Sequence, residues 1–522
     1  MEANREGEAD GGHQAAGKEA RQGVGKTRTR ASLISPRAAS RLRPAEFPLL
    51  GCGAPVRGQS FHPYPVKPPH SAPSRRHFVK TLGAAALTAP FFTRHLRSAA
   101  PSATLRHASF GSAGQAWADI QAITSNPFVK LVAVAEVDLN RIAQVKEWHP
   151  DVRVYQDWRQ LLEKEAGNID SVNVSTPDHL HAPIALSAMQ LGKHVYCQKP
   201  LAHDVYETRV LTNYAREKKL ITQMGIQIHS QSEYRLAVVL VQGGAIGKVK
   251  EVHTWSNKKW GDLGAPPPST EVVPDGFNWD LWLGGVSSRP YIGNTYYHPE
   301  NWRKRLDFGT GTFGDMGCHI YDPVFNALAL TAPLSLRSDG PAPDQWNWAI
   351  NAQIRYVFPG TKYTAGKTVA VTWYDGEARP PADILALVPP PAVEQKDAKG
   401  RVRNLYEQGS IIIGTEGVLH IPHIANPRLF PLEKFKDYPM PKVTGTHHWS
   451  DWAEACLSGK NPSANFDYSG PLTEAVLLGS VAVRFPQTEL KWDTTKLEFT
   501  NEKKANAYVR RTYRQGWDVK GL

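Results

Sequence analysis

Residues 194–202 read HVYCQKPLA, an apolar run that ends in a polar Gln-Lys-Pro turn. The run is typical of a β-strand, and Pro200 ends it because proline has no N–H to donate to a neighbouring strand. Lys199 is therefore expected at the carboxyl end of a strand, where ligands bind in an open parallel sheet. A lone turn lysine is usually only solvated, so the surrounding pattern has to support a functional interpretation.

The sequence around this turn alternates between β-rich and helical segments. The β-rich runs are 106–110, 130–137, 171–175 and 194–197, and the helical stretches are 117–124, 139–148, 182–191 and 204–218. Strands that alternate with helices at this spacing predict a parallel sheet covered on both faces. We therefore expect an α/β protein whose residues 104–225 form a Rossmann-type, doubly wound domain.

The turn after the first expected strand reads GSAGQA, residues 111–116, and lies where a dinucleotide-binding turn belongs. Gly111 allows the tight turn, and Ala116 is small enough for the helix to meet the strand. Ala113 stands where a second glycine is usual, with Gly114 beside it, so the pattern is imperfect. Alone it is a weak signal, because glycine turns follow strands in many sheet proteins.

The second expected strand ends in acidic residues, LVAVAEVD at 131–138. This position is about 20 residues past the glycine turn, where a carboxylate accepts the hydroxyls of an adenine ribose. Glu136 is the first candidate and Asp138 the second. A carboxylate repels a ribose phosphate, so NAD is favoured over NADP; a solvated strand end is the alternative.

Residues 226–522 have a different pattern, with strand character at 249–255, 348–358, 368–374 and 410–421 and helical character at 315–330 and 449–457. Many strands with few helices predict a second α/β domain with an open, mostly antiparallel sheet covered on one side. Aromatic residues gather between positions 255 and 302. Aromatic faces can stack on a sugar ring, but we expect most of them to be packing residues.

The segment 309–322 reads GTGTFGDMGCHIYD and carries the acid–base candidates. If a helix begins near Asp315, then Asp315 and His319 share a face. An aspartate can hold a histidine in one tautomer and raise its basicity, and an imidazole suits proton exchange with a sugar hydroxyl. Pro323 predicts a kink or an irregular start in this helix. A surface or capping interaction of the two residues is the alternative.

Four segments together resemble the Gfo/Idh/MocA family, named for glucose-fructose oxidoreductase, inositol dehydrogenase and a rhizopine-catabolism protein. They are TPDHLH at 176–181, the 194–202 stretch, GIQ at 225–227 and the 309–322 segment. The similarity runs from about residue 105 to the C-terminus, with the motifs in the family's order. The resemblance implies a dinucleotide domain followed by a substrate and oligomerisation domain over 226–522.

The resemblance also implies roles for individual residues. Lys199, Asp315 and His319 match the family's catalytic lysine, aspartate and histidine, and the lysine and histidine divide orientation and proton transfer between them. Gln198 replaces the glutamate of the family's Glu-Lys-Pro motif, and loss of a carboxylate neighbour is expected to lower the pKa of Lys199. Further cofactor contacts are expected from Thr176, Pro177, His181, Gln198, Lys199 and Gln227, and substrate contacts from Tyr297, Trp302, Asp315 and His319.

The first hundred residues are unlike the rest of the chain. Residues 1–73 are rich in Gly, Ala, Arg, Ser and Pro, and are expected to be a disordered leader or a mis-set start. SRRHFVK at 74–80 resembles a twin-arginine signal, with Arg75, Arg76, Phe78 and Lys80 matching, so 74–103 is expected to direct export to the periplasm. The apolar part is too short to span a bilayer, and a chance Arg-Arg pair is the alternative.

Charge and cysteine content exclude several function classes. The first hundred residues hold 16 Lys and Arg against 6 Asp and Glu, whereas the remainder holds 45 against 43. The folded part is nearly neutral, which argues against nucleic-acid binding. The four cysteines, Cys52, Cys197, Cys318 and Cys456, have no paired spacing, so we expect neither a disulfide framework nor a metal site. Cys52 lies in the leader, and we interpret the other three as small buried residues.

Three functions fit these observations. The first is an exported NAD-dependent oxidoreductase acting on a secondary alcohol of a sugar or cyclitol, with NAD retained because no exchangeable pool exists outside the cytoplasm. The second is a glycoside-cleaving enzyme that works by transient oxidation and elimination with no net redox change. The third is a sugar-binding protein without turnover. The resemblance adds the expectation of a homo-oligomer, and export implies the twin-arginine machinery as a partner.

Overall fold

The structure, a computed structural model, describes residues 104–390, 395–396, 402–404 and 406–522. The expected leader (1–73) and the expected signal peptide (74–103) both lie outside these residues, so both remain predictions. Among the helices that the structure does describe, none combines the length and the apolar character needed to cross a bilayer.

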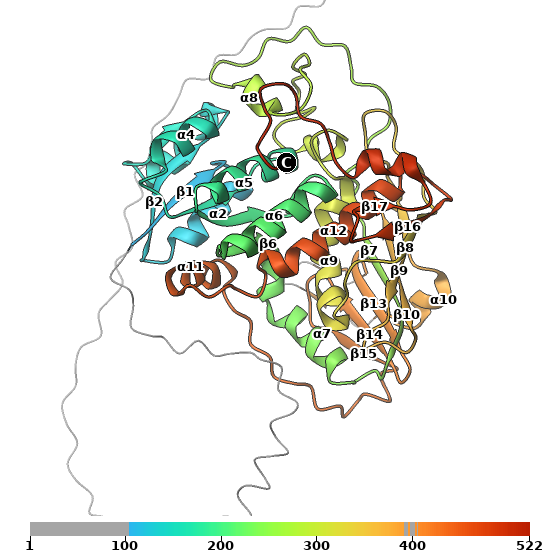
Figure 1. The fold of residues 1–522 in the computed structure, drawn as a ribbon. Helices are drawn as coiled ribbons and strands as arrows, with labels where there is room; N and C mark the ends of the chain where they lie inside the picture. Colours follow the sequence, from blue (N-terminus) through green and yellow to red (C-terminus); the bar gives the residue numbers. More distant parts are fainter. Residues whose placement is uncertain (1–103, 391–394, 397–401, 405) are drawn as a thin grey trace, which may run out of the picture. The chain divides into compact units, whose positions relative to one another are not determined.

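The first sheet has six parallel strands in the order β3-β2-β1-β4-β5-β6 (Figure 1). Its strands are β1 (Leu105–Phe110), β2 (Val129–Ala135), β3 (Arg153–Tyr155), β4 (Ser171–Val174), β5 (His194–Gln198) and β6 (Thr222–Gly225). The strand order reverses between β1 and β4, and a ligand crevice opens at such a point in a doubly wound sheet. This confirms the expected Rossmann-type domain, although β3 and β6 were not anticipated.

Helices cover both faces of this sheet: α5 packs against α4 and α6, while α2 packs against α11. Local sequence explains where α6 begins, because Asp204 and Glu207 form a reciprocal capping box at its first turn. The elements between the strands are α2 (Gln115–Thr124), η1 (Leu139–Arg141), α3 (Ala143–Trp148), α4 (Trp158–Glu165), η2 (Asp178–Leu180), α5 (His181–Gln190), α6 (Val205–Lys218) and η3 (Gln227–Ser230).

The second sheet has nine strands in the order β15-β14-β13-β7-β10-β9-β8-β16-β17, and among these only β7 and β10 pair in parallel. The mostly antiparallel sheet is as expected, but the run at 410–421 is a hairpin of two strands. The strands are β7 (Val249–Ser256), β8 (Ser335–Ser338), β9 (Gln353–Pro359), β10 (Thr368–Asp375), β13 (Gln408–Gly414), β14 (Val418–Pro422), β15 (Arg428–Phe430), β16 (Glu489–Asp493) and β17 (Glu498–Phe499), besides a separate pair β11 (Gln395–Lys396) and β12 (Val402–Arg403).

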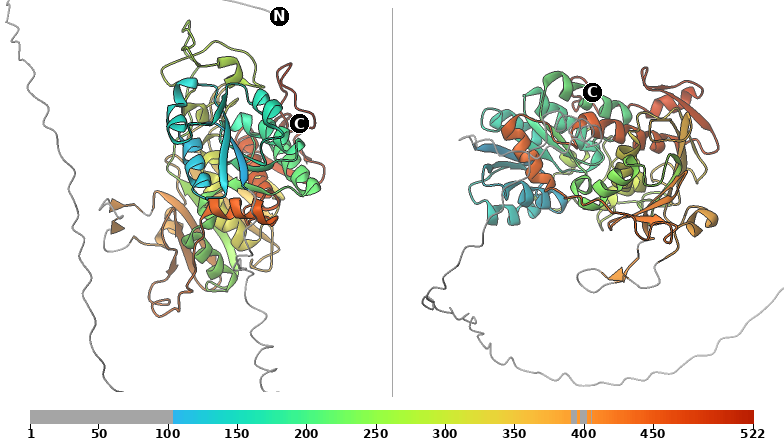
Figure 2. Two further views of the ribbon diagram at one scale, coloured as in Figure 1. Left: turned by 90° about the vertical axis from the view of Figure 1, so that its left-hand side faces the viewer. Right: turned by 90° about the horizontal axis from the view of Figure 1, so that it is seen from below.

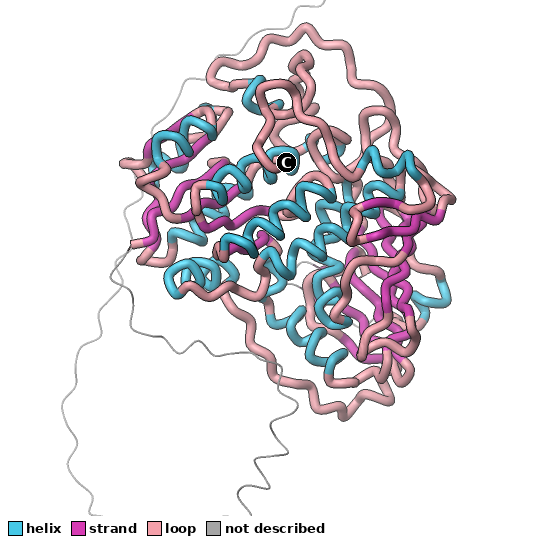
Figure 3. Tube along the Cα trace, in the orientation of Figure 1, coloured by secondary structure: helices cyan, strands magenta, loops and turns pink. Residues whose placement is uncertain are grey.

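A layer of helices lies between the two sheets (Figure 3). In this layer α9 packs against α7 and α12, and α12 also packs against α6 of the first domain. Pro323 lies inside α9, which nevertheless runs unbroken from Gly311. The helices of the second half are α7 (Ser232–Gln242), α8 (Trp279–Leu283), η4 (Asn301–Lys304), α9 (Gly311–Leu328), α10 (Ala382–Ala386), α11 (His448–Ser458), α12 (Phe466–Ala482) and η5 (Lys503–Tyr508).

The second half of the chain also returns to the first domain. Helix α11, more than 200 residues beyond β6, contacts α2 and β1, and Figure 2 shows it below the blue strands of the first sheet. Trp452 of this helix is fully buried against the edge of Tyr196 from β5. The two domains are therefore joined by packing on several elements, which fixes the site between them.

Candidate functional site

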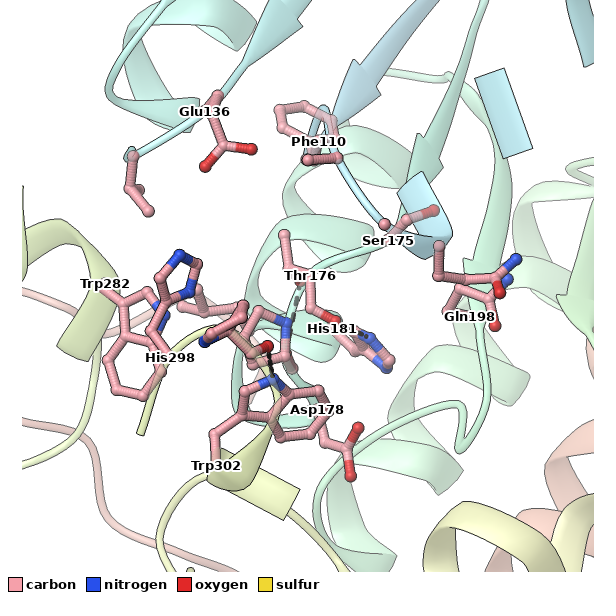
Figure 4. A pocket seen from close by; sticks show the side chains of 18 of the residues that line it. Phe110, Glu136, Ser175, Thr176, Asp178, His181, Gln198, Trp282, His298 and Trp302 are labelled. Atoms are coloured by element: carbon pink, nitrogen blue, oxygen red, sulfur yellow. Dashed lines mark hydrogen bonds between the residues drawn. The ribbon is translucent and has the colours of Figure 1, made fainter. Parts of the chain in front are cut away.

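A cavity runs along the carboxyl ends of β1, β2, β4 and β5 (Figure 4). One wall, which we name the first wall, consists of the turns that follow these strands and carries most of the expected cofactor residues. The opposite wall comes from the second half of the chain and includes Trp282, His298, Trp302 and Arg303. Of the expected site residues, those that line the cavity are Gly111, Ala113, Gly114, Glu136, Thr176, Pro177, His181, Gln198, Lys199 and Trp302.

The glycine turn has no room for a side chain at its first position. Gly111 has φ +98°, and a Cβ there would lie 2.7 Å from the Ser175 carbonyl oxygen and 3.0 Å from the Cβ of Ala116. Gly114, with φ +60°, directly precedes the first turn of α2. The backbone therefore comes close to the cavity at the start of a helix, as a diphosphate-binding turn requires, and the buried Ala116 keeps helix and strand together.

Glu136 closes one end of the cavity. Its Oε2 accepts hydrogen bonds from the backbone N–H (3.0 Å) and hydroxyl (2.8 Å) of Ser112, and its Oε1 accepts one from the N–H of Asp138 (3.0 Å). Burial raises the pKa of the carboxyl, and these hydrogen bonds oppose the rise. Asp138 is instead bonded to Asn140 and His298, and it is not among the described residues that line the cavity. Glu136 therefore suits the ribose better.

The opposite wall is a segment that we name the aromatic wall, residues 276–303. It is bonded to the end of β2, because Asn278 N–H donates to the Val137 carbonyl (2.8 Å) and Leu139 N–H donates to the Gly276 carbonyl (2.9 Å). Its aromatic side chains form a buried cluster in which Trp279 stacks on Trp282 at 4.8 Å between ring centroids. Most of the aromatic residues are thus packing residues, as expected.

The two expected substrate aromatics have different environments. Trp302 lines the cavity and donates its indole N–H to the Pro299 carbonyl at 2.9 Å. Tyr297 is only 3% exposed, packs between Trp279 and Phe308, and is not among the described residues that line the cavity. A direct contact between Tyr297 and a ligand would therefore require this cluster to open.

The C-terminal segment holds the aromatic wall in place. The guanidinium of Arg514 forms an ion pair with Asp280 at 2.5 Å and donates to the Gly284 carbonyl at 2.9 Å. Upstream of it, the partly buried Arg511 pairs with the buried Glu207 at the start of α6 (2.6 Å). The end of the chain thus connects the first domain to the aromatic wall.

Lys199 is bonded to α9 rather than to solvent. Its Nζ donates to the Oδ1 of Asp315 at 2.5 Å and to the Asp315 carbonyl at 2.9 Å. Arg303 Nε donates to the same Oδ1 at 3.2 Å. Burial alone would raise the pKa of Asp315, but the two cations outweigh it and hold that pKa well below its usual range. Asp315 is therefore an ionised carboxylate that orients Lys199.

The expected Asp315–His319 hydrogen bond is wrong. The carboxylate of Asp315 takes Lys199 and Arg303 as partners, and among the described residues the buried Nδ1 of His319 has none. Burial, with a further contribution from Lys199, lowers the pKa of His319 well below its ordinary value, although Asp315 acts in the opposite direction. Neither Asp315 nor His319 is among the described residues that line the cavity, and Asp315 is connected to it through Lys199.

Gln198 does not face the side chain of Lys199. Its amide Nε2 donates to the Oδ2 of the buried Asp119 on α2 at 2.8 Å. That carboxylate also accepts from Ser175 (2.7 Å) and Trp449 (2.9 Å). The carboxylate expected to be missing beside Lys199 is provided by Asp315.

The remaining expected cofactor residues lie on turns near Lys199. The imidazole of His181 is placed between the carbonyls of Thr176 and Pro200, each at 2.8 Å, and burial lowers its pKa to about 4. Thr176 and Pro177 line the cavity beside it. Gln227 lies on η3 with its amide 3.5 Å from the Tyr196 hydroxyl, and it is not among the described cavity residues.

Thiol and metal chemistry have no support in the described part of the chain. Cys197 and Cys318 are buried, and burial raises the pKa of both thiols, that of Cys318 to about 12. Cys456 is only partly buried, so its expected full burial is wrong. The described residues contain no group of three or more His, Cys, Asp or Glu side chains placed to hold a metal ion.

Family models match both halves of the described fold. Residues 108–226 match the oxidoreductase family's NAD-binding Rossmann fold, and residues 241–379 match that family's C-terminal alpha/beta domain. The chain belongs to the Gfo/Idh/MocA oxidoreductase family. The NAD-binding match includes Gly111, Glu136 and Lys199, and the second match includes Asp315 and His319.

Curated relatives of this Gfo/Idh/MocA chain are similar over part of their length. Levoglucosan dehydrogenase from Pseudarthrobacter phenanthrenivorans is 26% identical over 32% of this chain and 34% of that protein. Myo-inositol 2-dehydrogenase from Thermotoga maritima is 25% identical over 31% and 47%, respectively. Inositol 2-dehydrogenase 4 from Saccharopolyspora erythraea is 29% identical over 30% and 46%. The matched region spans about a third to a half of these relatives.

Solved structures share the fold over a greater length. The WlbA dehydrogenase from Bordetella pertussis in complex with NADH and UDP-GlcNAcA has a TM-score of 0.51 at 14% identity, covering 75% of this chain and 99% of that one. An oxidoreductase from Thermotoga maritima has a TM-score of 0.50 at 16% identity, covering 74% and 98%. At these identities the likeness establishes the fold alone.

Proposed function

We propose that the protein is an NAD-dependent oxidoreductase that acts on a secondary alcohol of a sugar or cyclitol. The observation that carries the proposal is the Lys199–Asp315 ion pair at the carboxyl end of β5, next to the glycine turn of a family NAD-binding domain. The named activities of the levoglucosan and inositol dehydrogenases support a sugar or cyclitol as the substrate class.

The residues of the first wall fit NAD. Gly111 allows the tight turn that brings the backbone to the cavity at the start of α2, as a diphosphate requires, and Glu136 offers carboxylate oxygens to the ribose hydroxyls. A carboxylate at this place disfavours a ribose phosphate, which supports NAD over NADP. Thr176, Pro177 and His181 line the part of the cavity that leads toward Lys199.

The chemistry divides between cofactor and protein. NAD, when bound, accepts a hydride from the alcohol carbon. The ammonium of Lys199, held by Asp315, donates a hydrogen bond to the alcohol oxygen and fixes its position. A base must take the hydroxyl proton. The candidates are His319, whose low pKa keeps its imidazole neutral and able to accept a proton, and Lys199, which can accept it only in its neutral amine form and not as the ammonium.

The proposal includes export and retention of the cofactor. The SRRHFVK segment supports passage through the twin-arginine machinery to the periplasm, where NAD cannot be exchanged with a pool. The aromatic wall supports retention, because it is bonded to the strand end beside Glu136 and is held by the C-terminal segment. Replacing Arg75 and Arg76 by lysine tests export. If the proposal is correct, the variant protein stays in the cytoplasmic fraction. We further expect a homo-oligomer, which light scattering checks.

Lys199→Ala tests the proposed chemistry. We expect the turnover number to fall by about 100-fold or more, since removal of a proton-handling and orienting group costs that much, while NAD stays bound. Lys193→Ala is the matched control, because Lys193 directly precedes the amino end of the same strand and donates to the Ala166 carbonyl. Unchanged turnover in Lys199→Ala would contradict the proposal. If wild type binds a sugar without turning it over, and Lys199→Ala binds that sugar with the same affinity, the protein is a sugar-binding protein.

A further inference from the structure

Asp178 is a buried carboxyl on the cavity wall with no role in the chemistry described above. It begins η2 in the TPDHLH turn after β4, is 4% exposed, and is one of the labelled cavity side chains in Figure 4. Its Oδ2 accepts a hydrogen bond from the Thr310 hydroxyl at 2.7 Å, which fixes the carboxyl in place. Within the described part of the chain, its other oxygen accepts no hydrogen bond.

Asp178 has two cations nearby, but both are bonded to Asp315. Lys199 and Arg303 donate to the Oδ1 of Asp315, so Asp178 forms no ion pair with any described residue. Burial raises its pKa to about 7; the charges of Lys199 and Arg303 oppose this rise, and that of Asp315 adds to it. The carboxyl thus loses and regains a proton near neutral pH, which suits a general acid or base.

The other titratable groups close to Asp178 do not change charge in that range. In its own turn, burial lowers the pKa of His179 to about 3 and that of His181 to about 4, so both imidazoles are neutral at pH 7. Across the cavity, Asp315 is ionised. Asp178 is therefore the group of this cluster whose charge changes around pH 7.

We infer that Asp178 is a second acid–base residue of this cavity, which removes and returns the proton on a substrate carbon next to a carbonyl group. The inference rests on the proposed function, because oxidation of an alcohol generates that carbonyl. Hydride removal needs only the group that accepts the hydroxyl proton. A second proton-transfer residue beside Lys199 gives the site chemistry beyond simple alcohol oxidation.

The step balances with the groups present. The carboxylate of Asp178 takes the proton from the carbon, the electrons of the broken C–H bond form a C=C bond, and the carbonyl electrons move to the oxygen. The ammonium of Lys199 stabilises the enolate oxygen by a charge-assisted hydrogen bond. Return of the proton from Asp178 to carbon restores the ketone. When a leaving group occupies the next carbon, the enolate electrons instead expel it, and the acid form of Asp178 protonates the departing oxygen.

The test supplies the ketone directly, so that it does not depend on hydride transfer. 2-Keto-myo-inositol and 3-keto-D-glucose are incubated with the NAD-loaded enzyme in D₂O, and NMR follows deuterium entering the carbon next to the carbonyl above the spontaneous rate. We expect wild type to accelerate the exchange of at least one ketone and Asp178→Asn to lower that acceleration about 100-fold or more. The exchange rate should rise with pH through about 7, as the carboxylate forms.

Asp375→Asn is the matched control. Asp375 is also buried, and burial also raises its pKa to about 7, but it is bonded to Trp373 and Ala352 away from this cavity. We expect this control to exchange deuterium at the wild-type rate. Asp178→Glu keeps a carboxyl, so it should retain part of the exchange with a displaced pH profile, and it serves in place of Asp178→Asn if that variant does not fold.

A parallel measurement separates this inference from the proposed function. Reduction of bound NAD by myo-inositol, levoglucosan or D-glucose reports hydride transfer, and Asp178→Asn should lower it less than tenfold. NAD reduction without enzyme-dependent exchange in wild type, or equal exchange in wild type and Asp178→Asn, would overturn the role of Asp178 alone. Absence of NAD reduction with all three alcohols would overturn the proposed function, on which the role of Asp178 depends.

Discussion

The two walls of the cavity are built in different ways. The first wall consists of short turns after the parallel strands β1, β2, β4 and β5. The positive φ of Gly111 and its closeness to the Ser175 carbonyl exclude any residue with a side chain at that position. The aromatic wall comes from residues 276–303, more than 70 positions beyond Lys199, and is held by backbone hydrogen bonds to the end of β2 and by Arg514. The first wall thus defines what binds, whereas the aromatic wall encloses it.

A similar contrast exists between the two carboxyls next to Lys199. Asp315 accepts from both nearby cations and stays ionised, while Asp178 is left with the Thr310 hydroxyl and titrates near neutral pH. Two acids in one cluster therefore have opposite pKa shifts because the cations are not shared equally. This difference allows one carboxyl to orient the lysine and the other to exchange protons.

The largest effect is expected from the first wall. Gly111→Ala places a Cβ 2.7 Å from the Ser175 carbonyl at φ +98°, so the turn must move. Strain and displacement together cost about 3 kcal/mol, which weakens NAD binding roughly 100-fold in calorimetry. Gly192→Ala is the control, because Gly192 also has a positive φ but nothing lies within 4 Å of its Cβ position. Equal NAD affinities in the two variants would mean that the turn does not contact the cofactor.

The next effect concerns stability. The pKa of Asp178 is raised from 3.8 to about 7 in the folded protein, so its contribution is complete below pH 3.8 and is lost as pH rises through 7. Asp178→Asn avoids ionising a buried carboxyl. Its free energy of unfolding relative to wild type should therefore increase between pH 5 and pH 8 by on the order of 2 kcal/mol. Urea unfolding at both pH values measures this, and a difference independent of pH would show that Asp178 does not titrate as described.

The smallest effect is expected at the aromatic wall. Arg514→Ala removes the ion pair with Asp280 and the hydrogen bonds to Gly284, so the wall opens more often. We expect NAD to dissociate about tenfold faster in stopped-flow chase experiments, which corresponds to about 1.4 kcal/mol. Arg216→Ala, which removes an exposed ion pair with Asp467, is the control. Equal dissociation rates would show that the aromatic wall does not retain the cofactor.

The first wall could be predicted from the sequence because its signals are local. The strand pattern, the glycine turn, Glu136 at the second strand end and Lys199 before Pro200 each follow from residues within a few positions of one another. Asp178 was visible in the TPDHLH motif, but its titration depends on which carboxyl receives the cations. The two cations bind Asp315 rather than Asp178 because of the positions of α9 and η4, which lie far along the chain.

The second half could be predicted only in outline. The i,i+4 spacing of Asp315 and His319 favoured a pair, but a lysine 116 positions away has the shorter contact. Helix α12 was missed because nearly all its residues are buried, which removes the polar face, and because Gly470 and Pro471 interrupt the pattern. The contact between Val137 and Asn278 has no local signal at all.

The most direct test of the account is to purify the exported protein, add no cofactor, and incubate it with myo-inositol, levoglucosan, D-glucose and aryl glycosides. The absorbance of reduced nicotinamide and the release of the aryl group are followed together. The account predicts that NAD co-purifies with the protein and is either reduced by an alcohol or left unchanged while the aryl group is released repeatedly. Protein that carries no nucleotide, and that binds none when NAD is added, would contradict it.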